Sequence, residues 1–202
     1  MINKLQLISI LLIFLSFFNC APKLTYIEIK EKVNNKYIAL NEKDFEYEYN
    51  NLPEKYIMEY GEEGLIKKLQ ETYELRKKDK FPITYDDIGD FKIQPINKCN
   101  STYFYKVKYI VDKVQMTPYL DSLALERNYK NYGKENVSFN SILKILEVRL
   151  YKEDILIFDK DKVWKLLAFK DFDSQLYDRL FRKGFSECVK TKIDNAEYLP
   201  YW

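Results

Sequence analysis

Hydrophobic and polar positions divide the chain into an apolar N-terminal run, a helical segment and a strand-rich remainder. The apolar run covers residues 5–18 and follows a single positive charge, Lys4. It is about 14 residues long, whereas a membrane-spanning helix needs about 20 and the hydrophobic region of a signal peptide has about 7–15. We therefore predict that residues 1–19 form a cleaved signal peptide. The alternatives are a buried N-terminal helix and an uncleaved membrane anchor.

Helical spacing is found in the second quarter of the chain. Asn51 and Pro53 form a helix-start signal, because Asn is a favoured N-cap and Pro a favoured first helical residue. The helical pattern extends to about residue 78, with a break predicted at residues 61–64. Upstream, polar and apolar residues alternate from Thr25 onward, so residues 20–42 are predicted to be a tether that can pair as a strand.

A period of two begins after Phe81 and is clearest in TYFYKVKYIV at residues 102–111. One face of this strand is apolar and aromatic and the other is polar, as expected when a single face is buried. Gly89 interrupts a neighbouring strand-like stretch, which predicts a β-bulge. The apolar face contains Tyr103, Tyr105, Val107, Tyr109 and Val111, and the polar face contains Lys106, Lys108 and Asp112.

The remaining pattern predicts two more helices and more strands. A helix is expected from Pro118 to Tyr132, with Leu120, Leu123 and Ala124 buried. Residues 142–151 fit either a strand or a helix, residues 155–169 fit a hairpin, and residues 174–183 fit a helix. Helices followed mostly by strands predict an α+β fold, with helices packed on one face of a curved antiparallel sheet. This domain would cover residues 43–184 and leave a C-terminal tail at residues 185–202.

Composition excludes several kinds of chemistry. The chain has 33 basic and 31 acidic residues, a formal charge of +2, which gives no electrostatic basis for nucleic-acid binding. It has no histidine, which excludes histidine-dependent triads and histidine-ligated metals. Two acidic clusters lack the spacing of a calcium loop and are interpreted as solvated turn residues. They are Asp86, Asp87 and Asp90, and Asp159 and Asp161. No catalytic residue, metal site or cofactor is predicted.

The residues LSFFNC at 15–20 resemble the cleavage site of bacterial lipoprotein signal peptides. In that family a peptidase cuts before a diacylated cysteine, and several acyl chains on one residue give stable anchoring. The resemblance therefore implies that Cys20 is lipidated. Phe17, Phe18 and Asn19 depart from the strictest form of the site, although looser forms occur in some Gram-negative groups. Ala21 is not an acidic retention signal, so the resemblance implies the outer membrane, with the domain facing the periplasm.

Two cysteines, Cys99 and Cys188, remain once Cys20 carries lipid. An even number of thiols in an exported protein favours a disulfide. Such a bond would join the C-terminal tail to the loop before the strand at residues 102–111. The alternative is a pair of buried free thiols.

Three further segments carry a family resemblance. They are GEEGLIKKLQETY at residues 61–73, YGKENVSF at residues 132–139 and VWKLL at residues 163–167. Together with residues 49–53 ahead of the first helix, they resemble small lipoproteins of Gram-negative bacteria with a cystatin-like, or nuclear-transport-factor-2-like, cone. The resemblance covers about residues 44–183 and favours a strand for residues 142–151. It implies a curved sheet with a concave face and no particular activity.

The functional expectation is a membrane-anchored, non-catalytic envelope lipoprotein that binds a partner protein or a small apolar ligand. Tyr103, Tyr105 and Tyr109 are the candidate pocket residues, because they share the face of the strand that would line the cone. The same residues could simply pack beneath the helices. An enzyme with a carboxylate and a tyrosine in an acid–base pocket is an alternative, and a periplasmic inhibitor or immunity-like protein is another.

Overall fold

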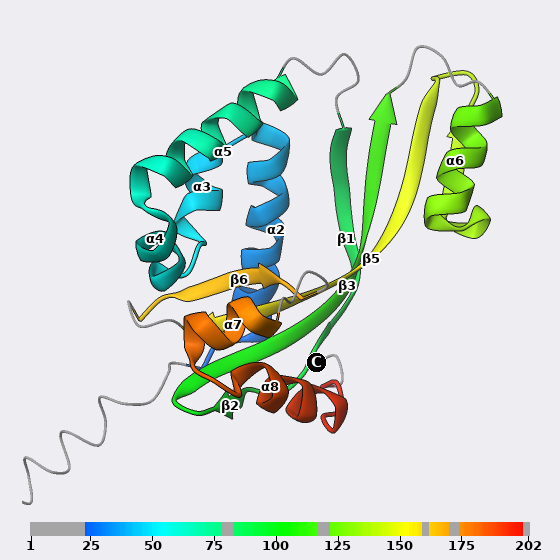
Figure 1. Ribbon diagram of the computed structural model, residues 1–202. Coiled ribbons are helices and arrows are strands. Elements are labelled where there is room, and N and C mark those ends of the chain that lie inside the picture. The colour runs from blue at the N-terminus through cyan, green and yellow to red at the C-terminus, as the bar shows by residue number, and fades with distance from the viewer. Residues whose placement is uncertain (1–22, 78–82, 117–121, 159–161, 170–173, 200–202) are drawn as a thin grey trace, which may run out of the picture.

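The computed structural model describes residues 23–77, 83–116, 122–158, 162–169 and 174–199. In these residues the architecture is α+β: N-terminal helices pack on an antiparallel sheet, and further helices follow at the C-terminal end (Figure 1). The predicted α+β class is confirmed. The predicted signal peptide and Cys20 lie outside the described residues.

Four helices precede the sheet, and their boundaries follow local signals. Gly61, at φ 79°, separates the last two, which confirms the break predicted there. Asp44 caps the second helix by accepting the backbone N–H groups of Glu46 and Tyr47. The helices are α2 (Tyr26–Glu42), α3 (Phe45–Asn50), α4 (Glu54–Tyr60) and α5 (Glu62–Lys77).

The strand predicted between residues 24 and 29 is wrong, because these residues begin α2. Thr25 and Glu28 form a capping box, in which the Thr25 hydroxyl accepts the Glu28 N–H and the Glu28 carboxylate accepts the Thr25 N–H. Ile29, Val33 and Tyr37 then recur at four-residue spacing and are buried. The helix therefore belongs to the core, and the segment is not a free tether.

The sheet contains six antiparallel strands in the order β1-β3-β5-β4, with β2 paired to β3 and β6 paired to β5. The register of β1 against β3 shifts twice, once after Gly89, which confirms the predicted bulge. Residues 145–150 are in a strand, as the resemblance implied. The strands are β1 (Ile83–Ile93), β2 (Asn97–Cys99), β3 (Thr102–Met116), β4 (Val137–Asn140), β5 (Ile145–Phe158) and β6 (Trp164–Ala168).

Helices cover both faces of the sheet, which corrects the prediction that they cover one. Tyr105 and Tyr109 of β3 pack with Val33 of α2 on the first face. Phe104, one residue out of phase, packs with Phe185 on the second. The second layer consists of α7 (Ser174–Phe181) and α8 (Phe185–Asp194), so the predicted tail contributes a core helix.

This second layer also buries Lys106, which the alternating pattern of β3 predicted to face solvent. The Lys106 side chain is 6% exposed, and its Nζ lies 2.9 Å from a Glu153 carboxylate oxygen and 4.5 Å from the Phe169 ring centroid. The prediction that Lys106 belongs to a solvated face is therefore wrong. A strand covered by helices on both faces of its sheet buries both alternating sets of its side chains. A charged side chain in such a strand then needs a partner of opposite charge.

At the other end of the sheet, α6 (Ser122–Tyr132) packs beside β4 and β5, after which the 3₁₀ turn η1 (Lys134–Asn136) leads into β4. The inward residues of α6 are Leu125, Tyr129 and Tyr132. Leu123 is 64% exposed, so its predicted burial is wrong. The predicted start at Pro118 and the burial of Leu120 lie outside the described residues.

Candidate functional site

A cleft lies between α2, α3 and the β5–β6 hairpin. It consists of two cavities, of about 220 and 870 Å³, whose linings share Lys36, Leu40 and Ala168. We call the smaller cavity the apolar arm and the larger one the polar arm. Because both linings contain the same three residues, the two arms lie next to each other.

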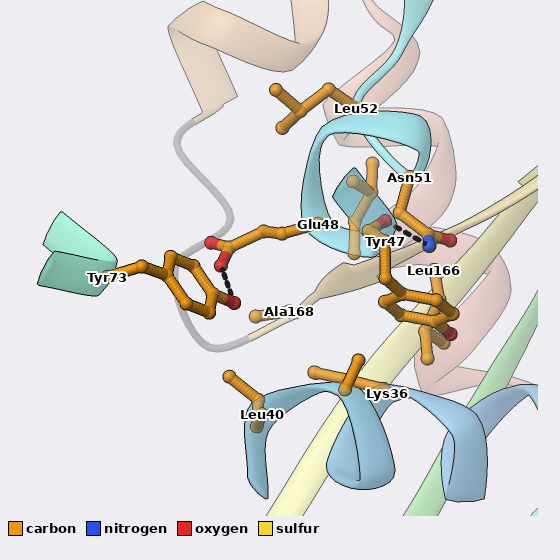
Figure 2. Close-up of a pocket in the computed structure, with 11 residues that line it drawn as sticks. Lys36, Leu40, Tyr47, Glu48, Asn51, Leu52, Tyr73, Leu166 and Ala168 are labelled. Atoms are coloured by element: carbon orange, nitrogen blue, oxygen red, sulfur yellow. Dashed lines mark hydrogen bonds between the residues drawn. The ribbon is translucent and has the colours of Figure 1, made fainter. Parts of the chain in front are cut away.

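The apolar arm is aliphatic along most of its wall. Figure 2 shows Leu40 and Lys36 rising from α2 toward Glu48 of α3, with Ala168 between them. The Tyr73 hydroxyl donates to a Glu48 carboxylate oxygen at 2.7 Å, which joins α5 to α3 at the rim. The aliphatic lining residues are Ala39, Leu40, Leu52, Leu166, Leu167 and Ala168.

A buried carboxylate, Asp154, lines the polar arm and contacts Lys36, which lines both arms. Asp154 is 2% exposed, and its Oδ2 lies 2.7 Å from Lys36 Nζ and accepts the Tyr109 hydroxyl at 2.5 Å. The hydroxyls of Tyr109 and Tyr37 are 3.1 Å apart. Lys36 is 25% exposed, so the cation reaches the cleft while the carboxylate stays inside. The negative charge is thus matched by one cation and one hydroxyl donor.

The fold explains how these groups meet. Val107 of β3 pairs with Asp154 of β5, so Tyr109, two residues along β3, is the diagonal neighbour of Asp154 on the same face. Lys36 and Tyr37 are adjacent in α2, which packs on this face. The cluster therefore depends on the β3–β5 register and on the position of α2.

Burial also raises the pKa of the two tyrosines. Desolvation is the largest cause that raises the pKa of Tyr109 well above its ordinary value, and the negative charge of Asp154 raises it further. Desolvation likewise raises the pKa of Tyr37. Both hydroxyls are protonated at neutral pH, as an unshifted tyrosine also is, so Tyr109 donates its hydrogen bond to the carboxylate.

The polar arm carries an excess of positive charge. Its charged lining residues are Lys36, Lys152, Glu153, Asp154 and Lys190. Glu153 is neutralised from outside the arm, since Lys106 and Lys108 each place Nζ 2.9 Å from one of its oxygens. Burial would raise the pKa of Glu153, but the hydrogen bonds from these two lysines outweigh it and lower the pKa. The arm suits an anionic group better than a cationic one.

The three predicted pocket tyrosines do not converge on one cavity. Tyr109 reaches the Asp154 cluster, whereas the Tyr105 hydroxyl accepts the Leu24 N–H at 3.1 Å. Tyr103 lies beneath Lys98, whose Nζ is 4.7 Å from its ring centroid. None of the three lines either arm. They pack largely against α2 and neighbouring side chains, which was the alternative interpretation of this face.

Sequence reasoning missed Lys36 and Asp154. A signal for Asp154 was present, because alternation in β5 places it on the same face as Leu150 and Leu156. An acid at an inward-facing position requires a partner. Nothing local to α2 identifies Lys36 as that partner.

Cys99 of β2 and Cys188 of α8 are joined in a disulfide, with Cα atoms 5.9 Å apart, as the cysteine count predicted. Gln94 also holds this end, because its side-chain amide donates to the carbonyls of Ile193 and Ala196 at 3.0 and 2.9 Å. The C-terminal helix is thus fixed to the sheet by a covalent bond and by buried hydrogen bonds.

Across the described ranges, no group of three or more acidic or cysteine side chains is arranged to hold a metal ion. Within the same ranges no helix is both long and apolar enough to cross a bilayer. No protein-family model, curated protein or solved structure matches the chain. The resemblance to cystatin-like lipoproteins stays a prediction from the sequence.

Proposed function

We propose that this protein is an envelope lipoprotein, anchored through Cys20, whose α+β domain binds a small amphipathic anion in the cleft. The proposal includes the cystatin-like curvature of the sheet and the outer-membrane location facing the periplasm. The observation that carries the binding function is the cleft itself, in which an aliphatic arm meets an arm with surplus positive charge. Concave, mostly apolar sites with a few placed polar groups are typical of small-molecule binding.

The two arms divide the recognition of such a ligand. An apolar tail in the apolar arm would contact Leu40, Leu52 and Leu166. Removal of this tail from water would favour binding. The anionic end would lie in the polar arm near Lys36, whose side chain is one-quarter exposed. The disulfide adds support for an oxidising compartment such as the periplasm.

Binding is tested with anilinonaphthalene sulfonate, an amphipathic anion that fluoresces in apolar sites. Ala168→Trp fills the place where the arms meet, and Leu52→Trp fills the opposite wall. We expect each to weaken the dye at least about tenfold, which corresponds to about 1.4 kcal/mol. Ala124→Trp on α6 is the matched control and should bind like the parent. Equal affinity in all three variants, with unchanged circular dichroism, would reject the cleft as the site.

Anchoring is tested separately in the full chain. Cys20→Ala should abolish incorporation of labelled fatty acid and release the protein from membranes in a flotation gradient. The same variant should keep its dye affinity, because it leaves the cleft residues Leu40, Leu52 and Leu166 unchanged. Flotation that is unchanged by Cys20→Ala would contradict the anchor alone.

A second candidate function is acid–base catalysis, and one observation favours it: a buried carboxylate contacts a tyrosine hydroxyl beside an open cavity. In this candidate Asp154 exchanges a proton with the substrate, and Tyr109 and Lys36 stabilise its charge. Mass spectrometry of a periplasmic extract incubated with the parent protein or with Asp154→Asn tests it. A compound consumed only by the parent would establish catalysis, and identical spectra would exclude it for that extract.

A further inference from the structure

The folded domain begins very close to the proposed anchor. Three peptide bonds separate Cys20 from Lys23, the first described residue. Because consecutive Cα atoms are about 3.8 Å apart, this segment spans at most about 11 Å. Leu24 is already held to the domain, since its backbone N–H donates to the Tyr105 hydroxyl and its side chain packs on the core. The lipid therefore cannot lie far from this end of the molecule.

Two other segments meet the start of α2 at this end. The Tyr105 ring packs on Trp164 at 5.1 Å, and Trp164 packs on Phe158 at 5.2 Å, which places the β5–β6 hairpin beside Leu24. Tyr103, two residues before Tyr105, lies beneath Lys98 from β2. Figure 1 shows β2 and the beginning of β3 together at this end of the sheet.

Exposed basic and apolar side chains both occur on these segments. Ile27 is 67% exposed on the first turn of α2, and Val163 is 46% exposed at the hairpin. Lys162 precedes Val163 directly, and Lys23 lies four residues before Ile27. We call this surface the anchor face, and it consists of Lys23, Tyr26, Ile27, Lys98, Lys162 and Val163.

Among the described residues at this end, two acids, Glu28 and Glu31, accompany the three lysines of the anchor face. Glu28 caps α2 through Thr25, and Glu31 is exposed one turn further along. The acids of the β5–β6 turn, Asp159 and Asp161, lie outside the described residues. Lysine with aliphatic and tyrosine side chains is the composition that suits a bilayer interface, where ammonium groups meet phosphate and apolar groups enter the headgroup layer.

We propose that the anchor face lies directly on the membrane, with its lysines on anionic phospholipid headgroups. This inference rests on the proposed lipidation of Cys20, which limits the distance between bilayer and domain. Each lysine near an anionic surface strengthens binding to that surface. Lys36 follows Tyr26 by ten residues in α2, so a rise of 1.5 Å per residue places Lys36 about 15 Å along the helix from this face. The cleft then opens beside the bilayer at a fixed height.

The experiment uses the full chain, acylated in a bacterial host and reconstituted in vesicles with and without anionic phospholipid. Ile27→Cys and Ile142→Cys each provide one reactive thiol, because Cys20 is acylated and Cys99 is bonded to Cys188. Ile142, 89% exposed in the β4–β5 turn, is the matched control. Each is labelled with an aqueous-phase fluorophore, and quenching by iodide is measured.

We expect quenching at position 27 to be several-fold weaker in anionic vesicles than at position 142, and equal at both positions after release in detergent. The triple variant Lys23→Glu, Lys98→Glu and Lys162→Glu should restore quenching at position 27 while the protein still floats with the vesicles. Equal quenching at both positions in floating vesicles would overturn the membrane contact and leave the anchor standing. Shielding in native membranes but not in pure-lipid vesicles would identify a protein on this face and also overturn it. Failure of the acylated parent protein to float with the vesicles would instead refute the anchor.

Discussion

Lys36 of α2 and Asp154 of β5 form an ion pair of 2.7 Å although 118 positions separate them in the chain. This pair joins the helical layer to the sheet at the point where the two arms of the cleft meet. The carboxylate is almost completely removed from water, so its charge depends on Lys36 and on the Tyr109 hydroxyl.

We predict that Lys36→Met destabilises the protein by about 2–3 kcal/mol, because it leaves a buried carboxylate without its cation. This value is below that of a fully buried pair because the Lys36 side chain is one-quarter exposed. Urea denaturation at neutral pH measures it. The double variant Lys36→Met with Asp154→Leu should recover much of the loss, since it also removes the charge that needs a partner.

Lys92→Met is the control for this prediction. Lys92 Nζ lies 3.5 Å from Asp90 Oδ1, and both side chains are exposed, so its loss should cost about 0–1 kcal/mol. An equal effect of Lys36→Met and Lys92→Met would show that the buried pair contributes no more than a surface pair.

Tyr109→Phe should lower stability at neutral pH by about 1–2 kcal/mol, because it removes a hydroxyl that bonds Asp154 and Tyr37. The pKa of Tyr109 is raised in the folded state, mainly by burial. Its contribution is therefore complete below the unfolded pKa of about 10 and declines as pH rises above that value. The stability difference between parent and variant should narrow under alkaline conditions.

Urea denaturation from about pH 7 to about pH 11 tests this predicted pH dependence, since that range spans the pKa of tyrosine in the unfolded chain. Tyr151→Phe, on β5 and largely exposed, is the matched control and should leave the pH profile unchanged. A difference between parent and Tyr109→Phe that grows with pH would contradict the assignment.

Features set by neighbouring residues could be predicted from the sequence. The apolar face of β3, the bulge after Gly89 and the helix break at Gly61 depend on alternation or on one glycine, and the structure contains all three. The start of α2 shows where local rules compete. Alternation from Thr25 favoured a strand, whereas the capping box with Glu28 and the burial of Ile29 stabilise a helix.

Features that depend on distant segments could not be predicted. The burial of Lys106 follows from a second helical layer that includes the supposed tail. The cleft needs α2 positioned over the β3–β5 register before Lys36 can meet Asp154. Of the predicted pocket residues only Tyr109 belongs to that cluster, because Tyr105 bonds Leu24 and Tyr103 packs under Lys98.

The Cys99–Cys188 disulfide should contribute about 2–4 kcal/mol, since it closes a loop of 89 positions and constrains the unfolded chain. Replacing both cysteines with serine should lower the denaturation midpoint and speed hydrogen exchange in α8. The parent protein treated with reductant should behave like the double variant, whereas reductant should not affect that variant. Alkylation of two thiols in the unreduced, denatured parent would contradict the bond.

Asp178 connects α7 to α8 by accepting two backbone N–H groups, from Ser186 at 2.7 Å and Gly184 at 3.0 Å. The hydrogen bond from Ser186 is the largest cause that lowers the pKa of Asp178. A carboxylate with a lowered folded pKa contributes stability above its unfolded value of about 3.9, and this is lost as pH falls through the folded value.

We therefore predict that Asp178→Ala lowers the free energy of unfolding by about 1–2 kcal/mol at neutral pH. This is less than for a fully buried carboxylate, because the Asp178 side chain is partly exposed. The difference from the parent should shrink as the pH falls below the unfolded value of about 3.9, because the parent carboxylate then becomes protonated as well. Urea denaturation across this range measures the difference. Asp112→Ala, which removes an exposed partner of Arg149, is the control and should cost little at any pH. A cost at Asp178 that persists undiminished in acid would mean that packing, and not the charged cap, holds the two helices together.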